Sequence, residues 1–122
     1  MKYLCLAYEA EATFTRMPRA EWDAVREETL AYVQALRQSG HLVDARALRS
    51  ASSAVTLKVR DGRLSVTDGP FIETKEQLGG FFLIEARDFD EAIQIAAQWP
   101  GARYGDIEVR PVEEGLPEDA RY

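Results

Sequence analysis

The chain has 122 residues, which fits a single domain of ordinary size. Hydrophobic residues make up 46% and charged residues 30%, a globular balance that excludes a disordered chain. The longest uninterrupted apolar run, residues 81–84, is far shorter than the roughly 20 residues of a membrane-spanning helix, so we expect no membrane segment.

Cysteine content, histidine content and net charge narrow the function classes further. The single cysteine excludes an internal disulfide. Together with a start that lacks the features of a signal peptide, it favours the cytoplasm. One cysteine and one histidine also exclude a tetrahedral zinc site of the usual kind within one chain, and we expect no metal or other cofactor. The net charge of −6 disfavours nucleic-acid binding.

The first third of the chain predicts a strand, a helix and a second strand. Residues 1–8 are apolar on both faces, so this strand should be covered on both sides. A polar connection over residues 9–17 leads to Pro18, which suits the first turn of a helix, where its missing N–H is not needed. Gly40 is predicted to end this helix, and a short strand follows at 42–48. The stripe that should face the core recurs at steps of three and four residues: Trp22, Val25, Thr29, Val33 and Leu36.

The clearest local signal is a β-hairpin around Asp61-Gly62. An Asp-Gly pair between two alternating runs is typical of a two-residue primed turn. The resulting register places Val59 opposite Leu64 and Leu57 opposite Val66, all on one side of the ribbon. The other side carries Lys58, Arg60, Arg63 and Ser65.

The second half predicts another strand, a helix and a last strand. Residues 79–86 form a strand that is apolar on both faces, and its first residues, Gly79-Gly80, favour entry into a crowded part of the sheet over a phosphate loop. Asp88 with Glu91 three residues later resembles a capping box, which begins a helix that ends at Pro100-Gly101. The last strand is expected at 107–112.

This order of elements predicts a ferredoxin-like α+β fold with an antiparallel or mixed sheet and an inserted β-hairpin. We expect the strands 1–8 and 79–86 to be central and parallel to each other, with two helices on one face of the sheet. The other face would then expose apolar side chains, so we expect a homodimer in which two sheets stack face to face. The domain spans residues 1–112, and the acidic tail 113–122 should lie on the surface.

Several motifs carry a family resemblance. They are Asp68-Gly-Pro-Phe71, then Thr74-Lys-Glu-Gln-Leu-Gly-Gly-Phe81, then Asp90-Glu-Ala92, and finally Glu108-Val-Arg-Pro-Val112. In this order they resemble the DGPF branch of the YCII-related domain family, over about residues 1–112. The resemblance implies a bacterial protein with a ferredoxin-like fold that dimerises as an α/β barrel.

The resemblance implies less about activity. Some relatives occur beside, or fused to, sigma factors, which suggests a regulatory partner of that kind. Simpler relatives carry a histidine in the first helix and an aspartate, suspected as a catalytic pair. Here residues 22–39 contain no histidine, and His41 lies beyond the helix end, where a hydrogen-bonding role is favoured. The His-Asp chemistry is therefore not expected in this chain.

The sequence places one candidate site around the loop that follows the hairpin. Hairpin parity puts Asp68 at the edge of an apolar face, where an unpaired carboxyl can act as a general acid or base. Lys75 or Arg110 could pair with it or hold an anionic ligand. Glu73 and Glu76 complete the polar set, with Glu108 beside Arg110. The alternative is structural: Asp68 satisfies turn amides, and the other charges form salt bridges that brace the dimer.

Aromatic side chains supply the apolar counterpart of this candidate site. Tyr3 is included among the ligand-binding candidates because its hydroxyl could add a polar group to a cleft. Core packing is the favoured interpretation of the aromatic residues as a set: Tyr3, Tyr8, Trp22, Phe81, Phe82 and Trp99.

Two functions from different classes follow. The first is a protein that binds a small anionic or aromatic metabolite in a cleft of a dimeric α/β barrel, with proton-transfer chemistry. No Ser-His or Cys-His pair is indicated, and whether a reaction is catalysed stays open. The second is a protein-interaction module associated with a sigma factor, favoured by the acidic charge and the long loop.

Overall fold

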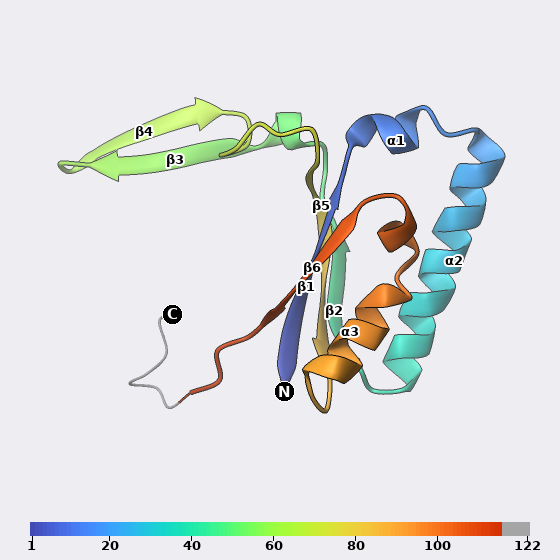
Figure 1. The fold of residues 1–122 in the computed structure, drawn as a ribbon. Coiled ribbons are helices and arrows are strands. Elements are labelled where there is room, and N and C mark those ends of the chain that lie inside the picture. The colour runs from blue at the N-terminus through green and yellow to red at the C-terminus, as the bar shows by residue number, and fades with distance from the viewer. Residues whose placement is uncertain (116–122) are drawn as a thin grey trace.

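The computed structural model describes residues 1–115 and has the ferredoxin-like α+β fold. A four-stranded sheet in the order β2-β5-β1-β6 carries the helices α2 and α3 on one face (Figure 1). The strands are β1 Lys2–Glu9, β2 Leu42–Ala47, β3 Val55–Arg60, β4 Arg63–Asp68, β5 Gln77–Glu85 and β6 Asp106–Pro111. The helices are α1 Glu11–Thr15, α2 Arg19–Gln38 and α3 Phe89–Ala97, with short 3-10 turns η1 Ala51–Ser53 and η2 Pro100–Arg103.

The central strands β1 and β5 are antiparallel, so the expectation of a parallel central pair is wrong. Tyr3 lies opposite Ile84 and Cys5 opposite Phe82, and both β1–β6 and β5–β2 also pair in the antiparallel sense. After β1, the helix α2 leads the chain back across the sheet, so that β2 runs parallel to β1. The chain then passes through the β3–β4 hairpin, and β5 enters the sheet between β2 and β1, antiparallel to both.

The predicted hairpin register is confirmed. Val59 lies opposite Leu64 and Leu57 opposite Val66. Asp61 and Gly62 have φ angles of 51° and 74°, the positive values that a primed turn requires at both central positions. The turn chemistry therefore determines this ribbon locally.

Three helix boundaries also follow the sequence signals. Pro18 occupies the position just before α2, and Gly40 leaves the helix with a φ angle of 79°. At α3, the carboxylate of Asp88 accepts a hydrogen bond from the backbone N–H of Glu91 at 2.9 Å. The carboxylate of Glu91 accepts one at 2.9 Å from the N–H of Arg87, one residue before the cap. The segment 9–17 is more structured than expected, since it contains α1.

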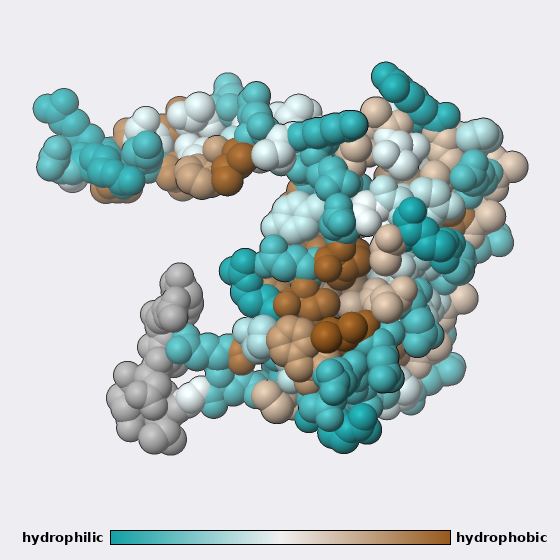
Figure 2. Space-filling view, viewed as in Figure 1, coloured by the Kyte–Doolittle hydropathy of each residue, from teal (hydrophilic) through white to brown (hydrophobic). Residues whose placement is uncertain are grey.

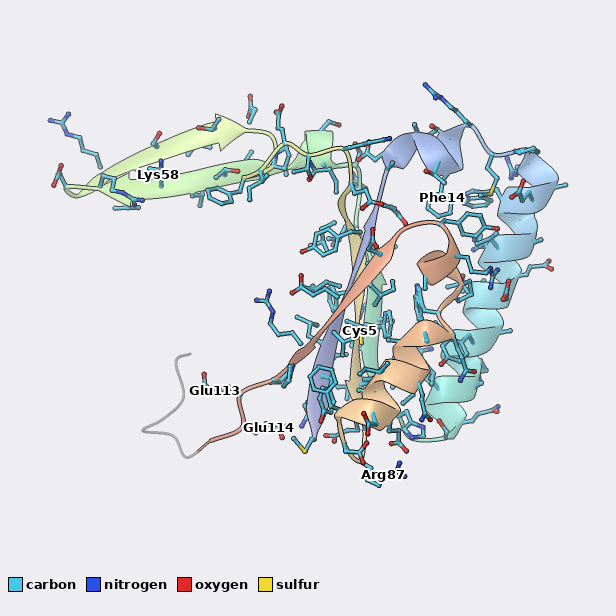
Figure 3. All side chains as sticks on the ribbon, viewed as in Figure 1. Cys5, Phe14, Lys58, Arg87, Glu113 and Glu114 are labelled. Carbon is cyan, nitrogen blue, oxygen red and sulfur yellow. The ribbon has the colours of Figure 1, made fainter. Side chains whose placement is uncertain are left out.

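The core lies between the sheet and α3. Side chains at alternate positions of β1 and β5 point toward the helices, and Cys5 lies in this layer (Figure 3). Phe82 stacks on Trp99 with ring centroids 4.0 Å apart. The fully packed apolar residues are Tyr3, Cys5, Leu36, Phe82, Ile84, Ala86, Ala92, Ile95 and Ala96.

The β3–β4 hairpin stands away from the body of the domain and projects beyond the sheet on the side without helices (Figure 1). Its apolar side is open to solvent, and Leu57 and Leu64 are 62% and 64% exposed. Figure 2 shows hydrophobic side chains along this hairpin and on the body beside it, with a hollow between them. The structure therefore presents an uncovered apolar surface on the hairpin, in addition to the sheet face expected from the sequence.

Across residues 1–115, no helix combines the length and the apolar character needed to cross a membrane.

Candidate functional site

A wide groove lies where the loop before β5 meets η1 and the start of β6. Its volume is about 1250 Å³, and we call it the loop groove. The loop of residues 70–78 forms one wall and is folded on itself, because the side-chain amide of Gln77 donates to the carbonyl oxygens of Ile72 and Thr74 at 2.9 and 3.1 Å. Tyr8 and Tyr104 also line the groove.

The opposite wall is held in place by Glu11 of α1. Its carboxylate accepts hydrogen bonds from the hydroxyl of Ser50 at 2.9 Å and from the backbone N–H of Ala51 at 2.8 Å. Both of these residues line the groove. The short helix that the sequence did not predict therefore anchors one side of the candidate site.

Two carboxyl groups, those of Glu76 and Asp106, meet in the loop groove. The pKa of Glu76 is raised, first because its carboxyl hydrogen-bonds to that of Asp106, then because of burial and the neighbouring negative charge. The positive charge of Lys75 acts in the opposite direction. A carboxyl whose pKa is raised by a neighbouring acidic group holds its proton to a higher pH than usual, and such a group can act as a general acid or base.

The structure brings together some of the residues predicted from the sequence. Lys75 and Glu76 line the loop groove, and the carboxylate of Glu73 lies beside Gly69 at the base of the hairpin. Asp68 ends β4 opposite Val55 and is exposed, and it is not among the residues that line the groove.

Two further candidates lie elsewhere. Arg110 forms an ion pair with Glu108 on β6, where Leu4 and Leu6 of β1 lie opposite them. Tyr3 is 1% exposed on the helix side of the sheet, where its ring packs edge-on to Phe89. A core position of this kind explains Tyr3 as packing, and it separates Tyr3 from the loop groove.

A second concavity lies between α2 and the sheet, and we call it the helix cleft. Its volume is about 590 Å³. Leu36 near the end of α2 is buried, whereas the preceding positions of the predicted stripe are only partly buried. The helix therefore stands off the sheet over most of its length. The stripe residues that line the cleft are Trp22, Val25, Thr29 and Val33.

The helix cleft holds a carboxyl group, that of Glu9. The side chain lies against Gly79, where an added Cβ would be 2.8 Å from its Cδ. Burial and the charge of Glu11 raise the pKa of Glu9. Gly80, beside it, faces the carbonyl oxygen of Arg46, 2.8 Å from where a Cβ would stand. The two glycines thus let the side chain of Glu9 and the backbone of β2 approach β5 closely. This agrees with the prediction that Gly79-Gly80 enters a crowded part of the sheet.

Comparison with known proteins agrees with the fold. The sequence profile of the YCII-related domain matches residues 1–115. The chain belongs to the YCII-related domain family. An uncharacterised protein of Rhizobium meliloti is 35% identical to this YCII-related chain over 114 residues, which cover 92% of both chains.

One solved structure shares the YCII-related fold described above. It is 5-chloro-2-hydroxyhydroquinone dehydrochlorinase from Burkholderia phenoliruptrix, in complex with 2,5-dihydroxybenzoquinone. It is 18% identical to this chain, with a TM-score of 0.53. The match covers 94% of this chain and 96% of the dehydrochlorinase chain.

His41, the single histidine of this YCII-related chain, has a structural environment. Its ring nitrogens lie 2.7 Å from the hydroxyl of Ser39 and 3.5 Å from the carboxylate of Glu91, so it links the end of α2 to α3. In the part of the chain that the structure describes, no group of three or more histidine, cysteine or acidic side chains is arranged to hold a metal ion.

Sequence reasoning missed two of the site residues, Glu9 and Asp106. Glu9 has the same strand parity as Cys5, so its place on the helix face was readable from the alternation in β1. Asp106 comes to Glu76 only through the pairing of β6 with β1, in which it lies opposite Tyr8. No local pattern indicates that pairing.

Proposed function

We propose that this YCII-related protein binds a small anionic or aromatic metabolite in the loop groove and transfers a proton there. The observation that carries the proposal is the Glu76–Asp106 carboxyl pair in a groove that Lys75 also lines. The complex of the dehydrochlorinase with a dihydroxybenzoquinone supports ligand binding by this fold.

Each polar group of the loop groove has a role in this proposal. Lys75 attracts the anionic group of the ligand, since its ammonium is a compact positive charge. Glu76, with the carboxyl of Asp106 beside it, gives a proton to the ligand or takes one from it. The hydroxyls of Tyr8 and Tyr104 orient the polar substituents of the ligand. The role of Asp68 as a further acid or base stays a prediction, as does the role of Arg110 as a further group that binds an anion.

A ligand panel tests this function. Small anionic and aromatic metabolites are screened by thermal shift with the wild-type protein, with Lys75→Gln and Asp106→Asn, and with Lys58→Gln as a matched control on the exposed hairpin. A ligand at 100 times its Kd stabilises the protein by about 2.7 kcal/mol, which raises Tm by several degrees. We expect the shift to fall in the two groove variants and to persist in the control. A panel without any shift, or shifts that both groove variants retain, would contradict the proposal.

We further propose that two copies pair through the sheet face without helices and the β3–β4 hairpin. Leu4, Leu6 and Leu83 remain partly exposed on this face, and the apolar side of the hairpin is open to solvent. Hydrophobic surface of this extent on a small domain favours a partner, and a second copy meets the same surface by two-fold symmetry.

The mass of the particle in solution tests the homodimer. Light scattering of the wild-type protein should give twice the mass of the chain. Leu57→Glu places a charge on the apolar side of the hairpin and should give the monomer mass, whereas Ser65→Glu on the polar side should leave the dimer intact. A monomeric wild type, or a dimeric Leu57→Glu variant, would refute this pairing.

The interaction module associated with a sigma factor stays a prediction from the family resemblance. Co-purification from the source cells distinguishes it from ligand binding. A stoichiometric sigma factor would favour it, whereas its absence, together with a ligand-dependent thermal shift, would favour the small-molecule function.

A further inference from the structure

The helix cleft is separate from the loop groove because the two open on opposite faces of the sheet. Tyr8 lines the loop groove, whereas its neighbours on β1, Ala7 and Glu9, line the helix cleft. Adjacent side chains of a strand point to opposite faces. A ligand in the helix cleft would therefore leave the loop groove and the open sheet face unoccupied.

The cleft is apolar, and both tryptophans of the chain line it. Trp22 comes from α2, and Trp99 stacks on Phe82 of β5. Phe14 of α1 also lines the cleft and lies between α1 and α2 (Figure 3). A volume of about 590 Å³ falls within the usual range of small-molecule pockets. The stripe of α2 faces this space without filling it, so the helix leaves room for a planar apolar group.

Polar groups with no protein partner border this apolar space. Arg26 and Arg37 line the cleft, and among residues 1–115 no ion pair or side-chain hydrogen bond involves their guanidinium groups. Within the same residues, the partly buried carboxyl of Glu9 also has no hydrogen-bond or ion-pair partner. The third arginine that lines the cleft, Arg46, is paired with Asp44 at 3.3 Å.

We propose that the helix cleft is a second binding site and that its ligand is a small planar aromatic acid. The ring lies among the apolar side chains of α2 and Trp99, where burial removes its surface from water. The acid group pairs with Arg26 or Arg37, because a guanidinium donates two parallel hydrogen bonds to a carboxylate. The carboxyl of Glu9 serves a polar substituent of the ring.

Tryptophan fluorescence tests this proposal directly, since both tryptophans lie in the cleft. The probe is 2-naphthoate, and its neutral control is 2-naphthamide, which has the same ring and nearly the same shape. We expect 2-naphthoate to change the tryptophan emission in a saturable manner and to bind at least tenfold more tightly than the amide. Emission that does not respond to either compound up to millimolar concentration, or equal affinities for both, would overturn the proposal.

Variants assign the binding to the cleft. Arg26→Gln combined with Arg37→Gln should bring the affinity for 2-naphthoate down to that for the amide, whereas Arg60→Gln on the hairpin should not change it. These arginines are exposed, so the fold should tolerate their replacement. Thr29→Phe fills the cleft and should weaken both compounds at least tenfold, whereas Gln34→Phe, at an exposed position of the same helix, should weaken neither. The site would be refuted if the arginine double variant still bound 2-naphthoate more tightly than 2-naphthamide. It would also be refuted if Thr29→Phe bound the two compounds with wild-type affinity.

The same measurement separates this site from the loop groove. Lys75→Gln and Asp106→Asn should leave the fluorescence titration with 2-naphthoate unchanged. A titration lost in these two variants would assign the probe to the loop groove and overturn the second site. Failure of the second site would leave the thermal shifts that depend on Lys75 and Asp106 unaffected.

Discussion

The side chain of Glu9 lies directly against Gly79, on the strand next to its own. An added Cβ at position 79 would be 2.8 Å from the Cδ of Glu9 and closer still to its carboxylate. The absence of a side chain at this one position is therefore what admits the carboxyl group into the wall of the helix cleft.

The contact predicts a strong coupling between these two positions. Gly79→Ala should destabilise the protein by about 1–3 kcal/mol, because the extra methyl group overpacks the site and displaces Glu9. In the Glu9→Ala background, Gly79→Ala should have almost no effect on stability, because the side-chain atoms of Glu9 that would collide with the new methyl group are absent. Denaturant unfolding of the two single variants and the double variant gives the coupling energy. Additive effects would show that the two side chains do not compete for this space.

The ionisation of Glu9 predicts a pH-dependent effect of Glu9→Gln. Burial and the charge of Glu11 raise the pKa of Glu9 above its ordinary value of 4.5. The stability linked to the protonated form is therefore present below pH 4.5 and is lost as the pH rises through the raised pKa. Glutamine avoids this loss, so Glu9→Gln should raise Tm by about 1–3 °C at pH 7.5.

A comparison at two pH values checks the sign of that effect. The Tm difference between Glu9→Gln and the wild type should shrink toward zero at pH 4, where both side chains are uncharged. Asp23→Asn, at an exposed position of α2, serves as a control for the removal of one carboxylate. A Tm difference that is the same at both pH values would contradict the assigned burial of Glu9.

Cys5 is predicted to be inert in the folded protein. The thiol has no exposed surface, and burial raises its pKa to about 12 from the ordinary value of 9.0. The thiolate is the reactive form, so three pKa units lower its fraction about a thousandfold at pH 8. Ellman's reagent should therefore label the protein only after unfolding in guanidinium. Complete labelling of the native protein within minutes would show that the sheet and helices open at this position.

The helix cap at Asp88 predicts that replacing this residue lowers the stability of the protein at neutral pH and has little effect in acid, where the carboxylate is protonated. The backbone N–H of Glu91, and then Arg87, lower the pKa of Asp88 below 3.8. The contribution of this carboxylate is therefore present above pH 3.8 and is lost as the pH falls through the lowered pKa. Asp88→Ala should lower Tm by about 2–6 °C at neutral pH, whereas Asp88→Asn should retain most of the cap. Equal losses in the two variants would contradict a capping role for the side-chain oxygen.

The sequence predicted those features that a few neighbouring residues determine. Asp61 and Gly62 specify the hairpin turn, and the alternation on each side then sets its register. Asp88 and Glu91 likewise indicate where α3 begins. The loop with Lys75 and Glu76 was recognised as a candidate site because its charges stand together in the chain.

The direction of the central strands was beyond local reasoning. Both β1 and β5 are apolar on two faces whether they run parallel or antiparallel, so the pattern alone does not distinguish the two arrangements. The helix α1 was missed for a similar reason. It is five residues long, too short for a helical period to be seen, and Phe14 stabilises it by packing against Tyr104 with ring centroids 5.8 Å apart.

Local sequence signals were enough to predict the hairpin, the long helices, the family and a charged loop, because turn residues, caps and periodic apolar positions act over a few residues. Which charged groups meet depends instead on the way the strands pair. Asp106 reaches Glu76 through the β1–β6 pairing, and Glu9 enters the helix cleft because Gly79 of the neighbouring strand leaves room for it. Strand pairing joins residues that are far apart in the chain, and no spacing in the sequence records such contacts.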